Sequence, residues 1–408
     1  MQTKTKLFIF AGILILIIIV QFIIPDIGQT QNIRMQPTGQ GVSYDFDASP
    51  SFHSNNSPFF FHALREGIRF VNSADSEARW TSSFSLNRPI MVARGNFVAV
   101  GEESGGRDIF VFNENGLVFQ RSFEHPITVF SINESGILAV VVQYPNGHRV
   151  QIFTEEYVTT PAYSRLIVGT EESLWYPTAV EVSPNGQYIA VAILDLNTRL
   201  NTIVEIGYIN LSDGMRVTGN TFGVFSVDIF REQLVYSLRF MDDNRLIIAT
   251  TSYIIGYLIT PRSYSISTQR ELWRIELQNR LTHLDFYGSR YFAFVTGDRH
   301  MNAPDAPGVG TVHVYNVDGN LQSTFALGRR ATHFSLGHRT VLVGADRNFH
   351  AIDFNGRHLW EHNAIFDTSR RDVIFLGNTN TVLIGGQNRA EVHERRRVRV
   401  NDFDSVFN

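Results

Sequence analysis

The sequence predicts an all-β fold built from about seven repeated units of four strands each. Three observations support this prediction. Polar turns flanked by apolar segments recur along the chain, a second series of turns alternates with the first, and no long stretch of helical periodicity follows the N-terminal apolar segment. Each unit is therefore expected to be a meander of short strands.

The first series of turns marks one hairpin in each unit. The sequence VSPNG at residues 182–186 separates two apolar runs, which is typical of a β-hairpin. Seven turns of this kind are found, at residues 92–96, 132–136, 182–186, 240–244, 286–290, 335–339 and 376–380. Their spacing of roughly 40–58 residues lies in the range of propeller blades.

A second series of turns marks the other hairpin of each unit and lies at residues 71–76, 112–116, 210–214, 316–319 and 353–356. A four-stranded sheet with two apolar faces is not stable alone, and radial stacking of such sheets buries both faces against neighbours. The sequence therefore predicts a β-propeller. A tandem of β-sandwiches is the alternative, but it would show a change of pattern near the middle of the chain, which the sequence does not have.

The order of the two turn series predicts how the ring closes. A turn of the second series comes first in the chain, and a hairpin of the first series comes last, so strands near both ends are expected to share one blade. The N-terminal strands of that blade are expected at residues 67–71 and 78–84. The strand-like segments 59–64 and 389–396 fit this scheme less neatly. They either widen one sheet or form an eighth, split blade.

The N-terminus predicts a membrane anchor. Residues 7–24 form an apolar run interrupted only by Gln21, close to the ~20 residues that a membrane-spanning helix needs. Lys4 and Lys6 precede this run and Asp26 follows it, so the short N-terminus is expected inside the cell. A cleaved signal peptide is the alternative, but residues 25–29 contain no convincing small-x-small cleavage site.

These features give a domain organisation of four parts. Residues 1–6 are predicted to be a cytoplasmic N-terminus, residues 7–25 a transmembrane signal anchor, residues 26–57 a flexible linker rich in Gln, Gly, Ser and Asn, and residues 58–408 the propeller. The protein is therefore expected in the cytoplasmic (inner) membrane as a single-pass protein with its propeller outside. The oligomeric state is left open.

Composition excludes several kinds of chemistry. The chain contains no cysteine, and its only lysines are Lys4 and Lys6, so a cysteine nucleophile, a thiolate metal site and a lysine base in the propeller are ruled out. A formal net charge of −4 does not indicate a nucleic-acid partner. The loop with Asp298, His300 and Asp305 is interpreted as an ordinary polar loop rather than a metal site. No metal and no cofactor is predicted.

Three of the four tryptophans, Trp80, Trp273 and Trp360, occupy matching places in segments such as NGRHLWEHN, the region of residues 355–363. On these segments and on VSPNGQYIAVA, the chain resembles the PQQ-like and WD-repeat-like propellers of bacterial envelopes, including uncharacterised proteins with one membrane helix before the propeller. The resemblance implies that these tryptophans pack between blades. Quinone-dependent dehydrogenases of this fold carry an adjacent cysteine pair, which this chain lacks.

The candidate binding residues are those that directly precede the inner strand of each unit, because they are expected to surround one mouth of the central channel. They include Arg88, His125, Arg280, Arg330 and Arg371. Clustered arginines suit a carboxylate, a phosphate or an acidic protein surface. His283 and His333 repeat in register and are further candidates that point into the channel. The alternative is that the arginines solvate strand ends and that the histidines belong to the core.

No catalytic residue is predicted, because the sequence contains no recognised catalytic motif. The leading hypothesis is a non-enzymatic, membrane-tethered scaffold outside the cytoplasm that binds another envelope protein. The alternative is a propeller enzyme or small-ligand sensor, such as a hydrolase or lyase of an anionic envelope sugar or lactone, with its site at the channel mouth. A deep mouth with paired carboxylates or a bound metal would favour the enzyme, and a broad exposed apolar or basic surface would favour the scaffold.

Overall fold

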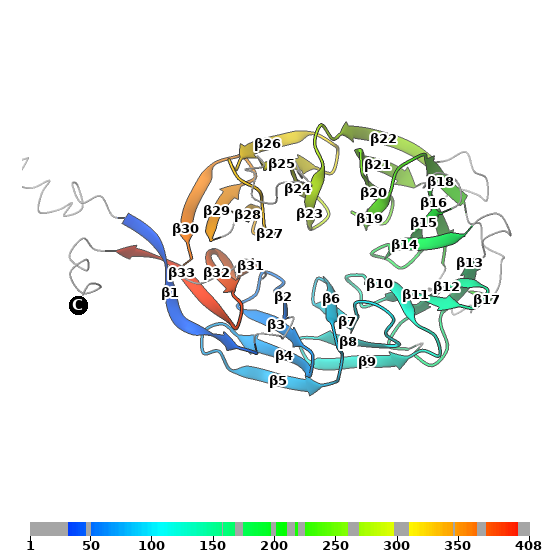
Figure 1. Cartoon of the computed structure of the whole chain (residues 1–408), viewed down its shortest axis with the longest axis horizontal. Helices are drawn as coiled ribbons and strands as arrows, with labels where there is room; N and C mark the ends of the chain where they lie inside the picture. The colour runs from blue at the N-terminus through cyan, green and yellow to red at the C-terminus, as the bar shows by residue number, and fades with distance from the viewer. Residues whose placement is uncertain are drawn as a thin grey trace, which may run out of the picture. The chain divides into compact units, whose positions relative to one another are not determined.

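The computed structural model describes residues 32–45, 50–156, 158–167, 174–196, 201–209, 217–218, 225–259, 269–297, 310–345, 347–364 and 373–398. The unit Pro37–Glu394 contains eight sheets that are arranged in a ring about a central axis (Figure 1). The prediction of an all-β propeller is therefore confirmed. The second unit, residues 1–36 and 395–408, contributes only the outer ends of two strands to the described part of the chain.

The first four blades follow the chain in order. Blade 1 contains β2 (Ser51–His53), β3 (Phe59–Leu64), β4 (Gly67–Asn72) and β5 (Ala78–Ser83), and blade 2 contains β6 (Pro89–Arg94), β7 (Phe97–Glu102), β8 (Asp108–Asn113) and β9 (Gly116–Ser122). Blade 3 contains β10 (Ile127–Ile132), β11 (Leu138–Tyr144), β12 (Gly147–Phe153), β13 (Tyr163–Ile167) and the short parallel strand β17 (Val217–Thr218). Blade 4 contains β14 (Trp175–Val182), β15 (Tyr188–Asp195), β16 (Asn201–Tyr208) and β18 (Phe225–Phe230).

The remaining four blades complete the ring. Blade 5 contains β19 (Val235–Phe240), β20 (Arg245–Thr250), β21 (Tyr253–Ile259) and β22 (Gln269–Glu276), and blade 6 contains β23 (Leu281–Tyr287), β24 (Tyr291–Thr296), β25 (Thr311–Asn316) and β26 (Leu321–Ala326). Blade 7 contains β27 (His333–Gly337), β28 (Thr340–Ala345), β29 (Asn348–Asp353) and β30 (His358–Asn363). Blade 8 contains β31 (Val373–Leu376), β32 (Asn378–Gly385), β33 (Arg389–Val398) and β1 (Asn32–Ser43).

The leading prediction of seven blades is wrong, and the alternative of eight is correct. All seven predicted turns of the first series join the first two strands of a blade. The eighth such turn, at residues 54–58, joins β2 to β3, and it lies in a segment predicted to be a flexible linker. β2 has only three residues and little apolar sequence, so it carries almost no strand signal.

Ring closure by strands from both ends of the chain is confirmed, but the strands differ from the prediction. β1 pairs with the C-terminal strand β33, whereas residues 67–71 and 78–84 belong to the complete blade 1. The Thr38 hydroxyl donates to the Val392 carbonyl (3.0 Å), and a Cβ at Gly41 would clash with the Ala390 carbonyl oxygen. This contact between chain ends turns part of the predicted linker 26–57 into strand.

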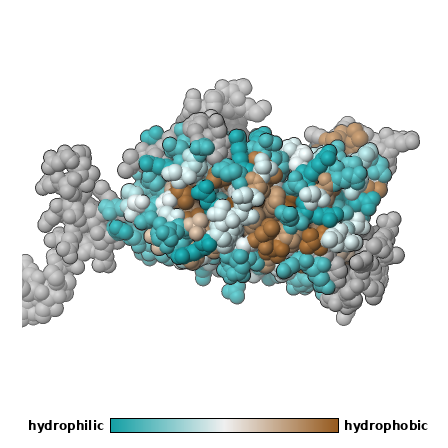
Figure 2. Space-filling model, turned by 90° about the horizontal axis from the view of Figure 1, so that it is seen from below, coloured by the Kyte–Doolittle hydropathy of each residue, from teal (hydrophilic) through white to brown (hydrophobic). Residues whose placement is uncertain are grey.

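The buried core lies between neighbouring blades rather than at one centre. β15 illustrates this, because seven of its eight residues are buried and its two faces belong to different hydrophobic clusters. Ala190 and Ala192 face blade 5, whereas Ile189 and Val191 face blade 3. Seen from the side of β5 and β9, the rim is mostly hydrophilic, but a group of hydrophobic residues interrupts the hydrophilic surface (Figure 2).

The tryptophans join blades as the resemblance implies. The indole Nε1 of Trp80 donates to the Glu114 carbonyl (2.8 Å), that of Trp273 to the Val317 carbonyl (2.9 Å), and that of Trp360 to the Thr379 carbonyl (3.1 Å). Each acceptor belongs to the next blade. These three hydrogen bonds fasten the outer strand of one blade to its neighbour.

Within the part of the chain that the structure describes, no helix is long and apolar enough to cross a membrane. The predicted cytoplasmic N-terminus and anchor, residues 1–6 and 7–25, lie outside the described residues.

Candidate functional site

The channel has two ends, which are defined by the direction of the inner strands. The start face is the end at which β6, β10, β14, β19, β23 and β27 begin, and the turn face is the end at which these strands pass into their hairpin turns. The predicted residues Arg88, His125, Arg280 and Arg330 all precede inner strands, so they belong to the start face.

The predicted residues of the start face have separate surroundings. The Arg88 guanidinium forms an exposed ion pair with Glu103 (2.6 Å), and the His125 ring lies 4.5 Å from the Tyr144 ring. Arg280 and Arg330 are exposed at the beginnings of the adjacent blades 6 and 7. The structure therefore places these two arginines on one face, but it gives Arg88 a partner of its own.

The two predicted histidines differ from each other. His283 is half-buried and its Nδ1 lies 3.1 Å from the Thr282 hydroxyl, whereas His333 is buried with its ring 5.4 Å from that of Phe349. His333 thus packs within its blade. Arg371, like Asp298, His300 and Asp305, lies outside the described residues.

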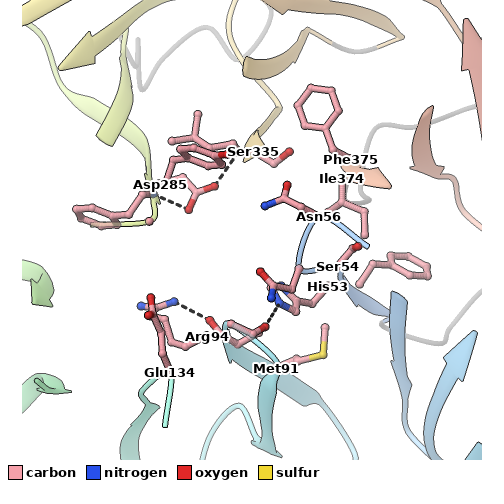
Figure 3. Close-up of a pocket in the computed structure, with 18 of the residues that line it drawn as sticks. His53, Ser54, Asn56, Met91, Arg94, Glu134, Asp285, Ser335, Ile374 and Phe375 are labelled. Carbon is pink, nitrogen blue, oxygen red and sulfur yellow. Dashed lines mark hydrogen bonds between the residues drawn. The ribbon is translucent and has the colours of Figure 1, made fainter. Parts of the chain in front are cut away.

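A cavity of about 630 Å³ opens at the turn face (Figure 3). Its lining combines polar side chains from different blades, including His53, Asn56, Arg94, Asp285 and Ser335. Apolar surface comes from residues such as Phe375. The volume lies in the range of roughly 300–1,000 Å³ that is typical of small-molecule sites.

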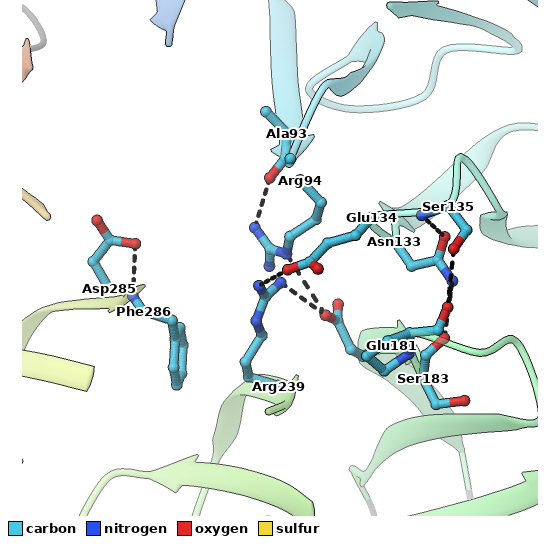
Figure 4. A network of polar contacts seen from close by, with 12 residues as sticks. Ala93, Arg94, Asn133, Glu134, Ser135, Glu181, Ser183, Arg239, Asp285 and Phe286 are labelled. Carbon is cyan, nitrogen blue, oxygen red and sulfur yellow. Dashed lines mark hydrogen bonds and ion pairs between the residues drawn. The ribbon is translucent and has the colours of Figure 1, made fainter. Parts of the chain in front are cut away.

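A charged network joins four blades beside this cavity (Figure 4). The buried carboxylate of Glu181 lies 3.3 Å from the Arg239 guanidinium and 3.7 Å from that of Arg94. Arg239 also lies 3.7 Å from the exposed carboxylate of Glu134. Arg94, Glu134, Glu181 and Arg239 come from blades 2, 3, 4 and 5, so the network crosses the channel end rather than following one blade.

Burial changes the protonation of several groups in this region. It raises the pKa of Glu181 to about 7, against the opposing effect of the Arg94 guanidinium. It also raises the pKa of Asp285, whose carboxylate accepts hydrogen bonds from the backbone N–H groups of Phe286 (2.8 Å) and Leu336 (2.9 Å). Burial lowers the pKa of His53 to about 4, and the Gly95 carbonyl opposes this change.

The contacts of these charges are mainly structural. Two carboxyl groups and two guanidiniums contact one another in the network, and Asp285 joins blade 6 to blade 7 through the Leu336 amide. Truncation of one member would leave another charge buried without its partner, which is costly. The network therefore fixes the turn face, and the polar groups around it leave a hydrophilic cavity.

Sequence reasoning missed this network because it considered residues before the inner strands. The signal lies inside those strands, near their ends. It is one residue before the last in blades 3 to 5 (Ser131, Glu181 and Arg239) and two residues before the last in blades 6 and 7 (Asp285 and Ser335). A polar or charged residue that recurs near the same end of otherwise apolar strands indicates a polar belt around the channel.

A hydrophobic patch occupies the start face of blades 4 and 5. It comprises Leu174, Tyr176, Leu196, Leu234 and Tyr236, which are between 38% and 65% exposed. The Leu196 amide donates to the Leu174 carbonyl (3.0 Å), and the Thr178 hydroxyl donates to the Val235 carbonyl of the next blade (2.9 Å). The first bond joins the two strands of blade 4 beside the patch, and the second joins blade 4 to blade 5.

One group of side chains among the described residues has the composition and spacing to hold a metal ion. It consists of His350, His358 and Glu361, on β29 and β30 of blade 7, far along the blade from the inner strand β27. This group is separate from the cavity and from the hydrophobic patch.

Comparison of the sequence with protein-family models assigns the chain to a family. The model of a family of unknown function, DUF5711, matches residues 60–393. The chain belongs to the DUF5711 family. A search of curated proteins finds no match for this DUF5711 protein.

The solved structures that resemble this DUF5711 protein share little sequence with it. Sqt1 of Saccharomyces cerevisiae is 10% identical and covers 88% of this chain and 100% of its own, with a TM-score of 0.54. BamB of Moraxella catarrhalis is 12% identical and covers 88% of this chain and 99% of its own, with a TM-score of 0.47. Because 905 solved chains match, the similarity describes a widespread fold and specifies no function.

Proposed function

We propose that this DUF5711 protein is a protein-interaction scaffold of the bacterial cell envelope that acts without catalysing a reaction. Residues 7–25 would tether it to the cytoplasmic membrane, and the propeller would lie outside, in keeping with the resemblance to membrane-anchored envelope propellers. The observation that carries the proposal is the hydrophobic patch. Five of the seven large hydrophobic side chains that are exposed among the described residues belong to it.

Exposed hydrophobic residues that are scattered singly need no explanation, but a contiguous group on one face is typical of an interaction site. The patch lies on two adjacent blades and includes two tyrosines, a residue type enriched in protein interfaces. Positive charge borders it, because the Arg280 guanidinium lies close enough to Tyr236 to affect its pKa. Arg330 lies on the same face, before the inner strand of blade 7. The partner is therefore expected to be a protein segment with apolar side chains flanked by carboxylates.

The experiment compares two exposed positions in living cells. A photo-reactive amino acid replaces either Tyr236 in the patch or Leu321, a matched exposed hydrophobic residue on the outer strand β26. We expect one protein to be crosslinked from position 236 and not from position 321. The same crosslink should weaken by more than tenfold when Leu234→Ser removes apolar surface, or when Arg280→Ala and Arg330→Ala together remove the bordering charge.

Equal crosslinking from both positions, or a crosslink that persists in these variants, would contradict the proposal.

The cavity supports a second function, because its size and polar lining suit a small hydrophilic ligand. A chain that crosslinks no protein and instead retains a small molecule, which Asn56→Leu releases, would favour the small-ligand sensor or enzyme over the scaffold.

A further inference from the structure

The outer edge of blade 7 brings together two imidazoles and a carboxylate. His350 lies on β29, and His358 and Glu361 lie on β30. One ligand atom from each of the three residues lies within 4.8 Å of the others. Nδ1 of His350 and Nε2 of His358 are 3.3 Å apart. His358 and Glu361 are exposed, so the group is open to solvent on one side.

The backbone explains how the three side chains reach one face. His350 pairs directly with Glu361 across the two strands, and Ile352 pairs with His358. A shift in register between these pairs leaves Leu359 as an extra residue in β30. Because side chains alternate between the faces of a strand, this bulge turns His358 to the face shared by His350 and Glu361.

The propeller itself does not require these residues. Five other blades have the same bulge in their outer hairpin, so the same three positions can be compared. In blade 4 these positions hold Ile203, Ile229 and Ser226. In the other four they hold Arg69, Thr81 and Ala78 in blade 1, Phe110, Gln120 and Leu117 in blade 2, Ile255, Arg274 and Glu271 in blade 5, and His313, Thr324 and Leu321 in blade 6. None of these sets combines two imidazoles with a carboxylate. The group is therefore a departure of blade 7 from the repeat.

The surroundings hold the side chains in place. Asn348 donates from Nδ2 to Oε1 of Glu361 (2.8 Å), which orients the carboxylate. The Phe325 ring of blade 6 stacks on the His358 ring (centroids 6.1 Å apart, planes at 13°) and forms an apolar wall.

We propose that His350, His358 and Glu361 bind a divalent transition-metal ion of the zinc class. Zinc accepts His nitrogen and Glu oxygen at about 2.0–2.2 Å in tetrahedral geometry, which places neighbouring donor atoms about 3.3 Å apart. The separation of the two imidazole nitrogens matches this value. Two nitrogen ligands disfavour calcium and magnesium, which prefer oxygen. Three protein ligands leave one position for water or for a ligand from another molecule.

The test measures metal binding directly and does not depend on the proposed function. The full-length chain, purified in detergent and freed of metal by a chelator, is titrated with zinc in a calorimeter and with cobalt in a spectrophotometer. We expect one tightly bound ion per chain, and with cobalt the visible absorption of a tetrahedral site. His358→Ala and Glu361→Gln should each weaken binding by more than about tenfold, since loss of even an outer partner of a ligand costs about 10–100-fold.

His125→Ala is the matched control, because it removes a histidine of blade 3 that lies outside the group. It should bind zinc as the wild type does. Unfolding in the presence of chelator should be the same for all variants, since His358 and Glu361 are exposed. Binding that is equally tight in wild type and His358→Ala, or that falls equally in His125→Ala, would overturn the proposal and leave only a hydrogen-bonded cluster.

Discussion

Replacement of Trp273 by Phe measures how much the hydrogen bond between its indole and the next blade contributes to the free energy of unfolding. The indole of Trp273 does two things. Its Nε1 donates to the Val317 carbonyl of blade 6 (2.9 Å), and its ring stacks on Phe292 (centroids 5.6 Å apart, planes at 8°). Phe retains a ring for the stacking contact but cannot donate a hydrogen bond. The substitution therefore separates the inter-blade hydrogen bond from most of the packing.

The expected loss of stability has two contributions. A carbonyl left without its donor in a buried position costs about 1–3 kcal/mol. The smaller ring also leaves a void beside Gly256 and Gly319, both of which lie against the indole. At about 24 cal/mol per Å³, a residual void of roughly 40 Å³ adds about 1 kcal/mol. Trp273→Phe should therefore lower the free energy of unfolding by about 2–4 kcal/mol.

Trp175→Phe is the matched control. The indole nitrogen of Trp175 is buried but has no hydrogen-bond partner among the described residues, so this substitution removes no hydrogen bond. It should cost only about 1 kcal/mol, from the void. Urea unfolding of the full-length chain in detergent, followed by far-ultraviolet circular dichroism, gives both values. Equal losses for the two variants would refute the reasoning, because packing alone would then account for the effect of Trp273.

Two further predictions concern ring closure and acid. Deletion of residues 1–43 removes β1 and exposes the edge of β33, so it should lower the urea midpoint and cause self-association that light scattering detects. Deletion of residues 1–31 leaves β1 in place and should have neither effect. Equal midpoints for the two deletions would contradict this prediction. Burial lowers the pKa of His62 and His393 to about 3 each, so the native state binds fewer protons than the unfolded state below about pH 6.5. The stabilisation from these neutral histidines is complete above that pH, and the free energy of unfolding should fall by about 3 kcal/mol per histidine between pH 6.5 and 4. His62→Phe should make the pH dependence of urea unfolding shallower. An unchanged slope would be evidence against this account.

The sequence predicts the repeated parts of the fold because local chemistry determines them. In VSPNG, for example, the Ser183 hydroxyl accepts from the Tyr188 amide (2.9 Å), and the Asn185 carboxamide oxygen accepts from the Gln187 amide (2.9 Å). Gly186 has a φ of 72°, which glycine adopts without strain. All of these requirements are visible in five consecutive residues and their neighbours. The seven turns found from the sequence are of this local kind.

The parts that were not predicted depend on contacts between distant residues. β1 carries Pro37, Gly39 and Gly41 in a polar segment, and this composition is typical of a linker. It becomes a strand only because β33 supplies the hydrogen-bonding edge, more than 340 residues away in the chain. Strand propensity therefore could not identify the closing strand, and the blade count was underestimated for a similar reason at β2.

The candidate sites show the same difference between features that local sequence determines and features that depend on distant contacts. That Arg280 and Arg330 share the start face follows from strand order alone, and this was predicted. The pairing of Arg94 with Glu181 was not, because blades 2 and 4 are not neighbours and the two side chains meet only across the channel end. A charged residue in an apolar strand was the available signal, but the sequence does not show which charges meet.

Function in a repeat protein is best sought where one unit departs from the others. The interblade tryptophans and the hairpin turns recur, so the architecture accounts for them. The hydrophobic patch is confined to blades 4 and 5, and the two imidazoles with their carboxylate are confined to blade 7, although other blades have the same backbone at those positions. A stable ring requires neither feature. Both therefore call for an explanation beyond folding, and contact with a partner protein and with a metal ion are the explanations that their chemistry supports.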